Sequence, residues 1–123
     1  MRLGETFLRA VAEGVATRDM WAPGAATDGL IDLWFNDGTH ASVYGSYLSA
    51  LTLYGTLTGL DPALFGAGEL AAKELGISAA DAVALQRIAS LQLGFTPPVP
   101  EPATALLALA GLAVIARRAR RTA

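Results

Sequence analysis

Residues 36–55, NDGTHASVYGSYLSALTLYG, contain the stretch that decides the fold. Its large apolar residues recur at helical spacing and predict a helix over residues 41–57, with Gly59 as its C-terminal stop. They are Tyr44, Tyr47, Leu48, Leu51, Tyr54 and Leu57. The same stretch contains the only histidine, His40, three residues after Asp37 and at the expected start of the helix. An Asp-x-x-His pair in that position is a candidate for acid–base chemistry.

Three further helices are expected around this stretch. Residues 2–16 place apolar side chains on one helical face and charges on the other. Residues 66–77 form a short helix closed by Gly76, and residues 78–94 begin with Ser78 and Asp81 at capping-box spacing. Residues 30–35, LIDLWF, are expected to form a short strand or an extended segment. The fold class predicted for the body is therefore mainly α.

Composition excludes several classes of function. The 123 residues form one domain at most, with 53% hydrophobic and 16% charged residues. Up to Pro98 the chain carries five basic residues against ten acidic ones, and this acidic body is not expected to bind nucleic acid. Without cysteine and with one histidine, thiolate sites and multi-histidine zinc sites are excluded, and no cofactor is expected.

The character of the chain changes after Gly94. Residues 95–102 form a proline-rich linker, residues 103–116 are fourteen residues without a charge, and residues 117–123 read RRARRTA. We expect residues 103–123 to form a transmembrane helix with a basic tail, because arginine side chains can snorkel and extend a short span. The positive-inside rule then places the C-terminus in the cytoplasm and the body outside. The alternative is a fourth core helix with a solvated basic end.

The order of these C-terminal parts resembles the PEP-CTERM sorting signal of Gram-negative bacteria, over residues 99–121. Its tripeptide corresponds to Pro100, Glu101 and Pro102, and its basic end corresponds to Arg117, Arg118, Arg120 and Arg121. The resemblance implies processing by an exosortase, which is a membrane-embedded cysteine protease. It also implies a membrane location during export and a cell-surface or extracellular location after processing. A residue before proline favours an extended backbone, the form in which a protease binds its substrate.

The body resembles the last sequence block of the SGNH (GDSL-like) hydrolases, from about residue 4 to residue 93. In that block Asp-x-x-His precedes the C-terminal helix, and Asp37 and His40 match the two positions. The resemblance implies that His40 is the general base for a serine nucleophile and that Asp37 orients its imidazole. It also implies that residues 1–94 are the helical C-terminal fragment of an α/β, flavodoxin-like hydrolase.

The chain departs from this family because it contains no Gly-Asp-Ser block and no oxyanion-hole block, and Ser42 and Ser46 share the helix that follows His40. We interpret it as an exported, membrane-tethered protein with an inactive hydrolase-like body, and as the C-terminal piece of a longer protein. One alternative is a serine ester hydrolase of unknown substrate whose nucleophile lies further upstream. Another is a small helical membrane-anchored interaction module.

Structural interpretations of the same residues stay open. His40 can simply be hydrogen-bonded to Asp37 at a helix start, and Asp37 can be a plain helix cap. The aromatic residues around the pair are expected in the core: Trp34, Phe35, Tyr44, Tyr47 and Tyr54. Without a sheet beneath it, the apolar face of residues 44–57 would lack a partner, and poor solubility is expected.

Overall fold

The structure is a computed structural model that describes residues 3–95 and 102–121. Its elements are α1 (Leu3–Ala12), the 3-10 turn η1 (Ala25–Thr27), α2 (Val43–Thr58), the 3-10 turn η2 (Pro62–Phe65), α3 (Leu70–Glu74), α4 (Ala79–Gln92) and α5 (Pro102–Arg121). The described residues contain no strand and only two isolated β-bridges. The prediction of a mainly α chain is confirmed.

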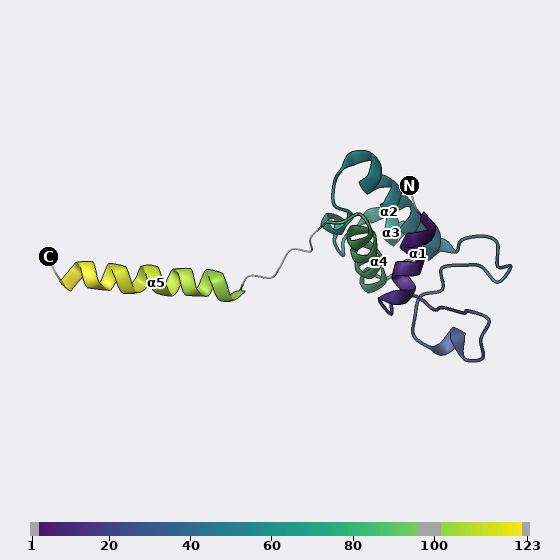
Figure 1. Cartoon of the computed structure of the whole chain (residues 1–123), viewed down its shortest axis with the longest axis horizontal. Helices are drawn as coiled ribbons and strands as arrows, with labels where there is room; N and C mark the ends of the chain where they lie inside the picture. Colours follow the sequence, from purple (N-terminus) through teal and green to yellow (C-terminus); the bar gives the residue numbers. More distant parts are fainter. Residues whose placement is uncertain (1–2, 96–101, 122–123) are drawn as a thin grey trace.

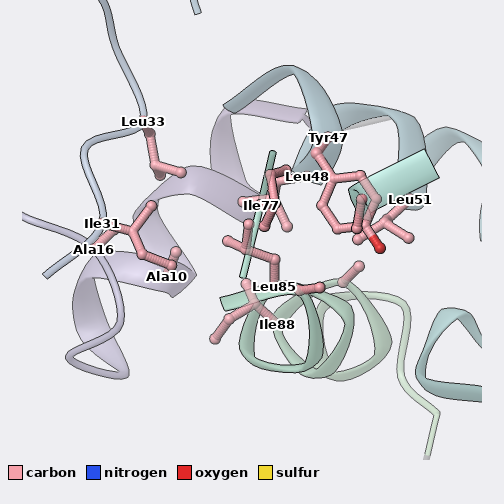
Figure 2. Close-up of a cluster of buried hydrophobic side chains, with 13 residues drawn as sticks. Ala10, Ala16, Ile31, Leu33, Tyr47, Leu48, Leu51, Ile77, Leu85 and Ile88 are labelled. Atoms are coloured by element: carbon pink, nitrogen blue, oxygen red, sulfur yellow. The ribbon is translucent and has the colours of Figure 1, made fainter. Parts of the chain in front are cut away.

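Three helices, α1, α2 and α4, pack against one another and enclose the core (Figure 1). Leu48 of α2 and Leu85 and Ile88 of α4 are completely buried, as is Ala10 of α1. Figure 2 shows these side chains converging between the helices. Burying one leucine or isoleucine side chain contributes about 1.5–3 kcal/mol, so this cluster is the main source of stability for the body.

Helix α2 begins at Val43, two residues later than expected. Ser42 is its N-cap, and the Ser42 hydroxyl accepts a hydrogen bond of 3.2 Å from the backbone N–H of Gly45. Gly59, with φ 69°, terminates the helix as predicted. The interpretation of Asp37 as the helix cap is wrong, because Ser42 has that role and His40 lies in the turn before the helix.

The close approach of α2 to the preceding segment depends on Gly45. A Cβ atom at this position would collide with the backbone carbonyl oxygen of Leu33, which itself accepts a 2.9 Å hydrogen bond from the Ser42 N–H. The absence of a side chain at residue 45 therefore allows residues 33–42 to lie directly against the helix. This contact fixes the turn that contains Asp37 and His40.

Helix α1 ends at Ala12 and does not reach residue 16, because Gly14 takes a left-handed conformation with φ 70°. The chain beyond it is extended and pairs with Ile31, whose N–H donates to the Val15 carbonyl at 3.0 Å. Thr17 N–H donates to the Ile31 carbonyl at 3.0 Å, which completes the bridge. The strand expected over 30–35 is thus reduced to an extended segment with one bridge near each end.

Helix α4 follows the prediction closely. The Ser78 hydroxyl accepts a 3.1 Å hydrogen bond from the Asp81 backbone N–H, and Gly94, with φ 80°, follows the last turn. Three of the predicted apolar residues, Leu85, Ile88 and Ala89, are completely buried. The helix is therefore defined by its own cap and by its apolar spacing.

The expected fragment of an α/β hydrolase is wrong as a fold class. The described residues form no sheet, and the buried residues of α2 (Tyr47, Leu48 and Leu51) belong to one cluster with residues of α1 and α4. The central part of the expected apolar face is therefore covered by helices and not by a sheet, whereas Leu57 at its end is 76% exposed.

The expected transmembrane helix is a second correction. Among residues 3–95 and 102–121, no helix is both long enough and apolar enough for a membrane crossing. Helix α5 has 20 residues, but its last turns contain Arg117, Arg118, Arg120 and Arg121. Its uncharged part is therefore shorter than the roughly 20 apolar residues that a span requires. Of the predicted linker at 95–102, residues 96–101 lie outside the described residues.

Candidate functional site

Asp37 and His40 lie in a tight turn between two bridged residues, Trp34 and Ala41. The turn is closed by a 2.8 Å hydrogen bond from the Phe35 N–H to the His40 carbonyl. Gly38, with φ 71°, occupies the left-handed position in the turn. The turn therefore places the two side chains on the same side of the loop by local geometry alone.

The side chains of the pair are in direct contact. His40 Nδ1 lies 2.6 Å from Asp37 Oδ2, while Asp37 Oδ1 accepts hydrogen bonds of 3.0 Å from the backbone N–H groups of Thr39 and His40. These backbone hydrogen bonds, followed by the contact with the imidazole, lower the pKa of Asp37 to about 2. In the tautomer that carries its proton on Nδ1, the imidazole donates to Asp37 and Nε2 is the basic nitrogen.

The surroundings of the pair differ from those of a hydrolase site. The side chains of His40 and Asp37 are 76% and 50% exposed, so bulk water reaches both. The Thr39 hydroxyl lies 3.2 Å from Nδ1 of the His40 ring, and therefore not on the side of Nε2. The backbone N–H groups of Thr39 and His40 already donate to Asp37 and are not available as oxyanion donors.

Two of the serines that follow His40, Ser42 and Ser49, have other roles. The Ser42 hydroxyl donates to the Asp32 carbonyl at 2.7 Å and accepts from Gly45 N–H as the helix cap. The Ser49 hydroxyl donates to the Gly45 carbonyl at 2.9 Å within α2. Neither hydroxyl is recorded in contact with the imidazole. The pair thus has the orientation of a base and its supporting carboxylate without a nucleophile among these neighbours.

Metal ligation has little support in the described part of the chain. Within residues 3–95 and 102–121, no three His, Cys, Asp or Glu residues are grouped in a way that could hold a metal ion. The pair itself offers one imidazole and one carboxylate, and a structural zinc site takes four ligands.

A second candidate site, not identified in the sequence, is a cavity of about 280 Å³ between α2, η2 and α3. Its lining consists of three aromatic residues, one acidic residue and five smaller or aliphatic residues: Tyr47, Tyr54, Phe65, Glu69, Ser46, Ala50, Leu51, Ala71 and Leu75. Neither Asp37 nor His40 contributes to this cavity. In the sequence, the helical spacing of Tyr47 and Tyr54 is the signal of a shared helix face, but it predicts core packing and not a cavity wall.

The aromatic residues expected in the core are divided between two environments. Tyr47 is 5% exposed, and Tyr44 packs against the core cluster. Trp34 and Phe35 are 41% and 51% exposed, although the Trp34 ring makes an edge contact with Phe7. The extended segment before the turn thus presents aromatic surface to solvent, contrary to expectation.

The predicted sorting residues fall partly outside the described residues. Pro100 and Glu101 lie there, and Pro102 is the first residue of α5. Arg117, Arg118 and Arg120 are exposed near the end of this helix, and Arg121 is its last residue. The large apolar side chains of α5 from Leu107 to Ile115 are between 65% and 72% exposed.

Comparison with protein families identifies this C-terminal region. Residues 98–121 match the model of the PEP-CTERM protein-sorting motif. The motif implies a protein that an exosortase processes and that is exported toward the cell surface. Comparisons with curated proteins and with solved structures gave no significant match, and they provide no support for an SGNH hydrolase-like body.

Proposed function

We propose that the chain has two functional parts, a helical body over residues 1–94 that is delivered, and a sorting signal over residues 99–121 that an exosortase removes. The match of residues 98–121 to the PEP-CTERM motif carries this proposal. The core of the body supports the division into two parts. Its described members all lie between Ala10 and Ala89, and none belongs to α5. The body therefore keeps its packed core whether or not the C-terminal helix is attached.

In this proposal the tripeptide Pro100–Glu101–Pro102 is the element that the protease recognises. Glu101 stands between two prolines, and a residue before proline favours extended backbone over helix. The exposed apolar side chains of α5 offer a contact surface for the processing enzyme. Arg117, Arg118, Arg120 and Arg121 hold the signal at an anionic lipid surface, where each arginine contributes about 1 kcal/mol.

The test is to express the full chain in a host with an exosortase and in the same host without it, and to measure the mass of the product. The unmodified chain is expected to lose its C-terminal segment only where the exosortase is present. Glu101→Ala should stay at full mass, whereas Glu74→Ala, which changes an acidic residue of the body, should be processed normally. Equal processing of the Glu101 variant and the unmodified chain would overturn the proposal.

A second candidate function is the proton-accepting half of an ester-hydrolase site, and the 2.6 Å contact between His40 Nδ1 and Asp37 Oδ2 favours it. In this proposal His40 Nε2 accepts the proton of a hydroxyl nucleophile, and Asp37 orients the ring. Because the recorded hydroxyl neighbour lies beside Nδ1, the purified chain should hydrolyse p-nitrophenyl acetate no faster than free imidazole at equal concentration. Saturable turnover that His40→Ala abolishes would instead assign hydrolase activity to this chain.

A further inference from the structure

The cavity between α2, η2 and α3 combines aromatic walls with one fixed negative charge. Tyr54 of α2 and Phe65 of η2 form a continuous wall, because their ring centroids are 4.8 Å apart at an angle of 49°. Tyr47 lies about two turns before Tyr54 in α2, and its ring belongs to the buried cluster shown in Figure 2. Glu69 is another residue of the same lining, and its carboxylate accepts a hydrogen bond from the hydroxyl of Tyr47.

The Glu69 carboxylate is held by hydrogen bonds that favour its charged form. Its two oxygens accept from the backbone N–H groups of Ala71 and Ala72 at 2.8 and 2.7 Å, and the Tyr47 hydroxyl donates to it at 3.1 Å. Partial burial raises the pKa of Glu69, but the hydrogen bonds from Ala72, Ala71 and Tyr47 outweigh it and lower the pKa. Glu69 is therefore an anion at neutral pH.

The tyrosine that contacts this carboxylate is itself fixed. Burial raises the pKa of Tyr47, so its hydroxyl keeps its proton and donates to Glu69. The side-chain amide of Gln86 donates to the Tyr47 oxygen at 3.0 Å and to the Gly66 carbonyl at 3.0 Å. This network connects α2, α3 and α4, and it keeps ring and carboxylate in place before any ligand arrives.

We propose that this cavity binds an organic ammonium cation, with the rings of Tyr47, Tyr54 and Phe65 around the charge and Glu69 as its counter-ion. Aromatic faces attract a cation, and quaternary ammonium groups are the ligands that aromatic cages recognise in other proteins. The volume of about 280 Å³ is just below the range of about 300–1,000 Å³ found for small-molecule sites, which suits a small ligand.

Other classes of ligand fit this cavity less well. An anion would meet the Glu69 carboxylate in a body that is already acidic. A divalent metal ion would find a single acidic residue there, and the described residues contain no cluster of three His, Cys, Asp or Glu residues that could hold one. A neutral apolar molecule would pack against the apolar walls but would have no interaction with the charge of Glu69. A weakly hydrated cation interacts with both the aromatic walls and this charge.

The test titrates the full ¹⁵N-labelled chain with choline and, separately, with 3,3-dimethyl-1-butanol, which is a neutral analogue of choline with the same shape. Choline should give saturable amide shifts centred on the residues that line the cavity. The neutral analogue should bind about tenfold more weakly, a ratio that corresponds to about 1.4 kcal/mol. Equal affinity of the two probes, or no saturable shift with choline, would overturn the proposal.

Three variants separate the charge, the ring and the net charge of the protein. Glu69→Gln should weaken choline binding about tenfold and leave the neutral analogue unchanged. Phe65→Leu keeps an apolar side chain without a ring. It should weaken the binding of choline more than the binding of the neutral analogue. Glu74→Gln removes one charge from α3 outside the cavity and should bind choline normally. Each variant is first checked by far-UV circular dichroism. If Glu74→Gln weakens choline as much as Glu69→Gln does, general electrostatic attraction explains the binding and the cage does not.

Discussion

Replacing Gly45 by alanine tests the packing that positions the Asp37–His40 turn. The added Cβ would collide with the Leu33 carbonyl oxygen, which is backbone and cannot rotate away as a side chain can. Overpacking of this kind costs about 1–3 kcal/mol. Displacing Leu33 also weakens the 2.9 Å hydrogen bond from the Ser42 N–H, at a cost of about 0.5–1.5 kcal/mol.

One favourable effect opposes these costs, because alanine is a better helix former than glycine by about 1 kcal/mol. The expected net result is a destabilisation of about 2 kcal/mol. For a domain of this size, that corresponds to a fall in Tm of about 10 °C. Thermal unfolding followed by circular dichroism at 222 nm measures it directly.

The matched control is Gly4→Ala in α1, where an added Cβ would meet nothing within 4 Å. This variant gains helix propensity without a collision and should be more stable by about 0.5 kcal/mol. The two glycine-to-alanine changes should therefore move Tm in opposite directions. If both raise Tm, α2 does not lie against Leu33 as described, and the argument for the position of the turn fails.

Three further predictions concern the core, the turn and a helix cap. Leu48→Ala should lower the free energy of unfolding by about 2–5 kcal/mol in urea denaturation, whereas Leu57→Ala, at a side chain 76% exposed on the same helix, should change it by less than about 0.5 kcal/mol. The Asp37 carboxyl carbon should titrate in NMR with a midpoint near pH 2. The pKa of Asp37 in the folded state is below its ordinary value of 3.8, so the ionised carboxylate stabilises the fold fully above pH 3.8. This stabilisation is lost as the pH falls through about 2. A midpoint near 4 would contradict the hydrogen bonds assigned to Asp37. Ser78→Ala should lower the free energy of unfolding by about 1 kcal/mol, because it removes the N-cap of α4. An unchanged free energy of unfolding would mean that this hydroxyl does not cap the helix.

The helices that could be predicted from the sequence are those defined by local features. The spacing of Leu85 and Ile88 and the serine cap at Ser78 lie within α4 itself, and the structure has both. The end of α1 was missed because it depends on Gly14, whose left-handed conformation is selected by the pairing of the next residues with Ile31. That pairing joins residues about fifteen positions apart, and local periodicity carries no information about it.

The two candidate sites differ in how far apart their residues lie in the sequence. Asp37 and His40 are three residues apart in one turn, so their contact could be expected from spacing alone, although the exposure of the turn could not. The cavity was missed because Tyr47, Phe65 and Glu69 come from three separate elements. A cavity of this kind exists only after α2, η2 and α3 have packed together. The expected α/β fragment was wrong for a related reason. An apolar helix face does not specify whether a sheet or other helices will cover it.

The arrangement of cavity and sorting signal along the chain has a consequence for the exported product. Every residue that lines the cavity lies between Ser46 and Leu75, and the core cluster ends at Ala89, whereas the matched sorting motif begins at residue 98. Processing within the motif would therefore remove no described side chain of the core or of the cavity. A body released in this way should bind the ammonium probe with the same affinity as the full chain, because the rings, the carboxylate and the helices that hold them are all retained.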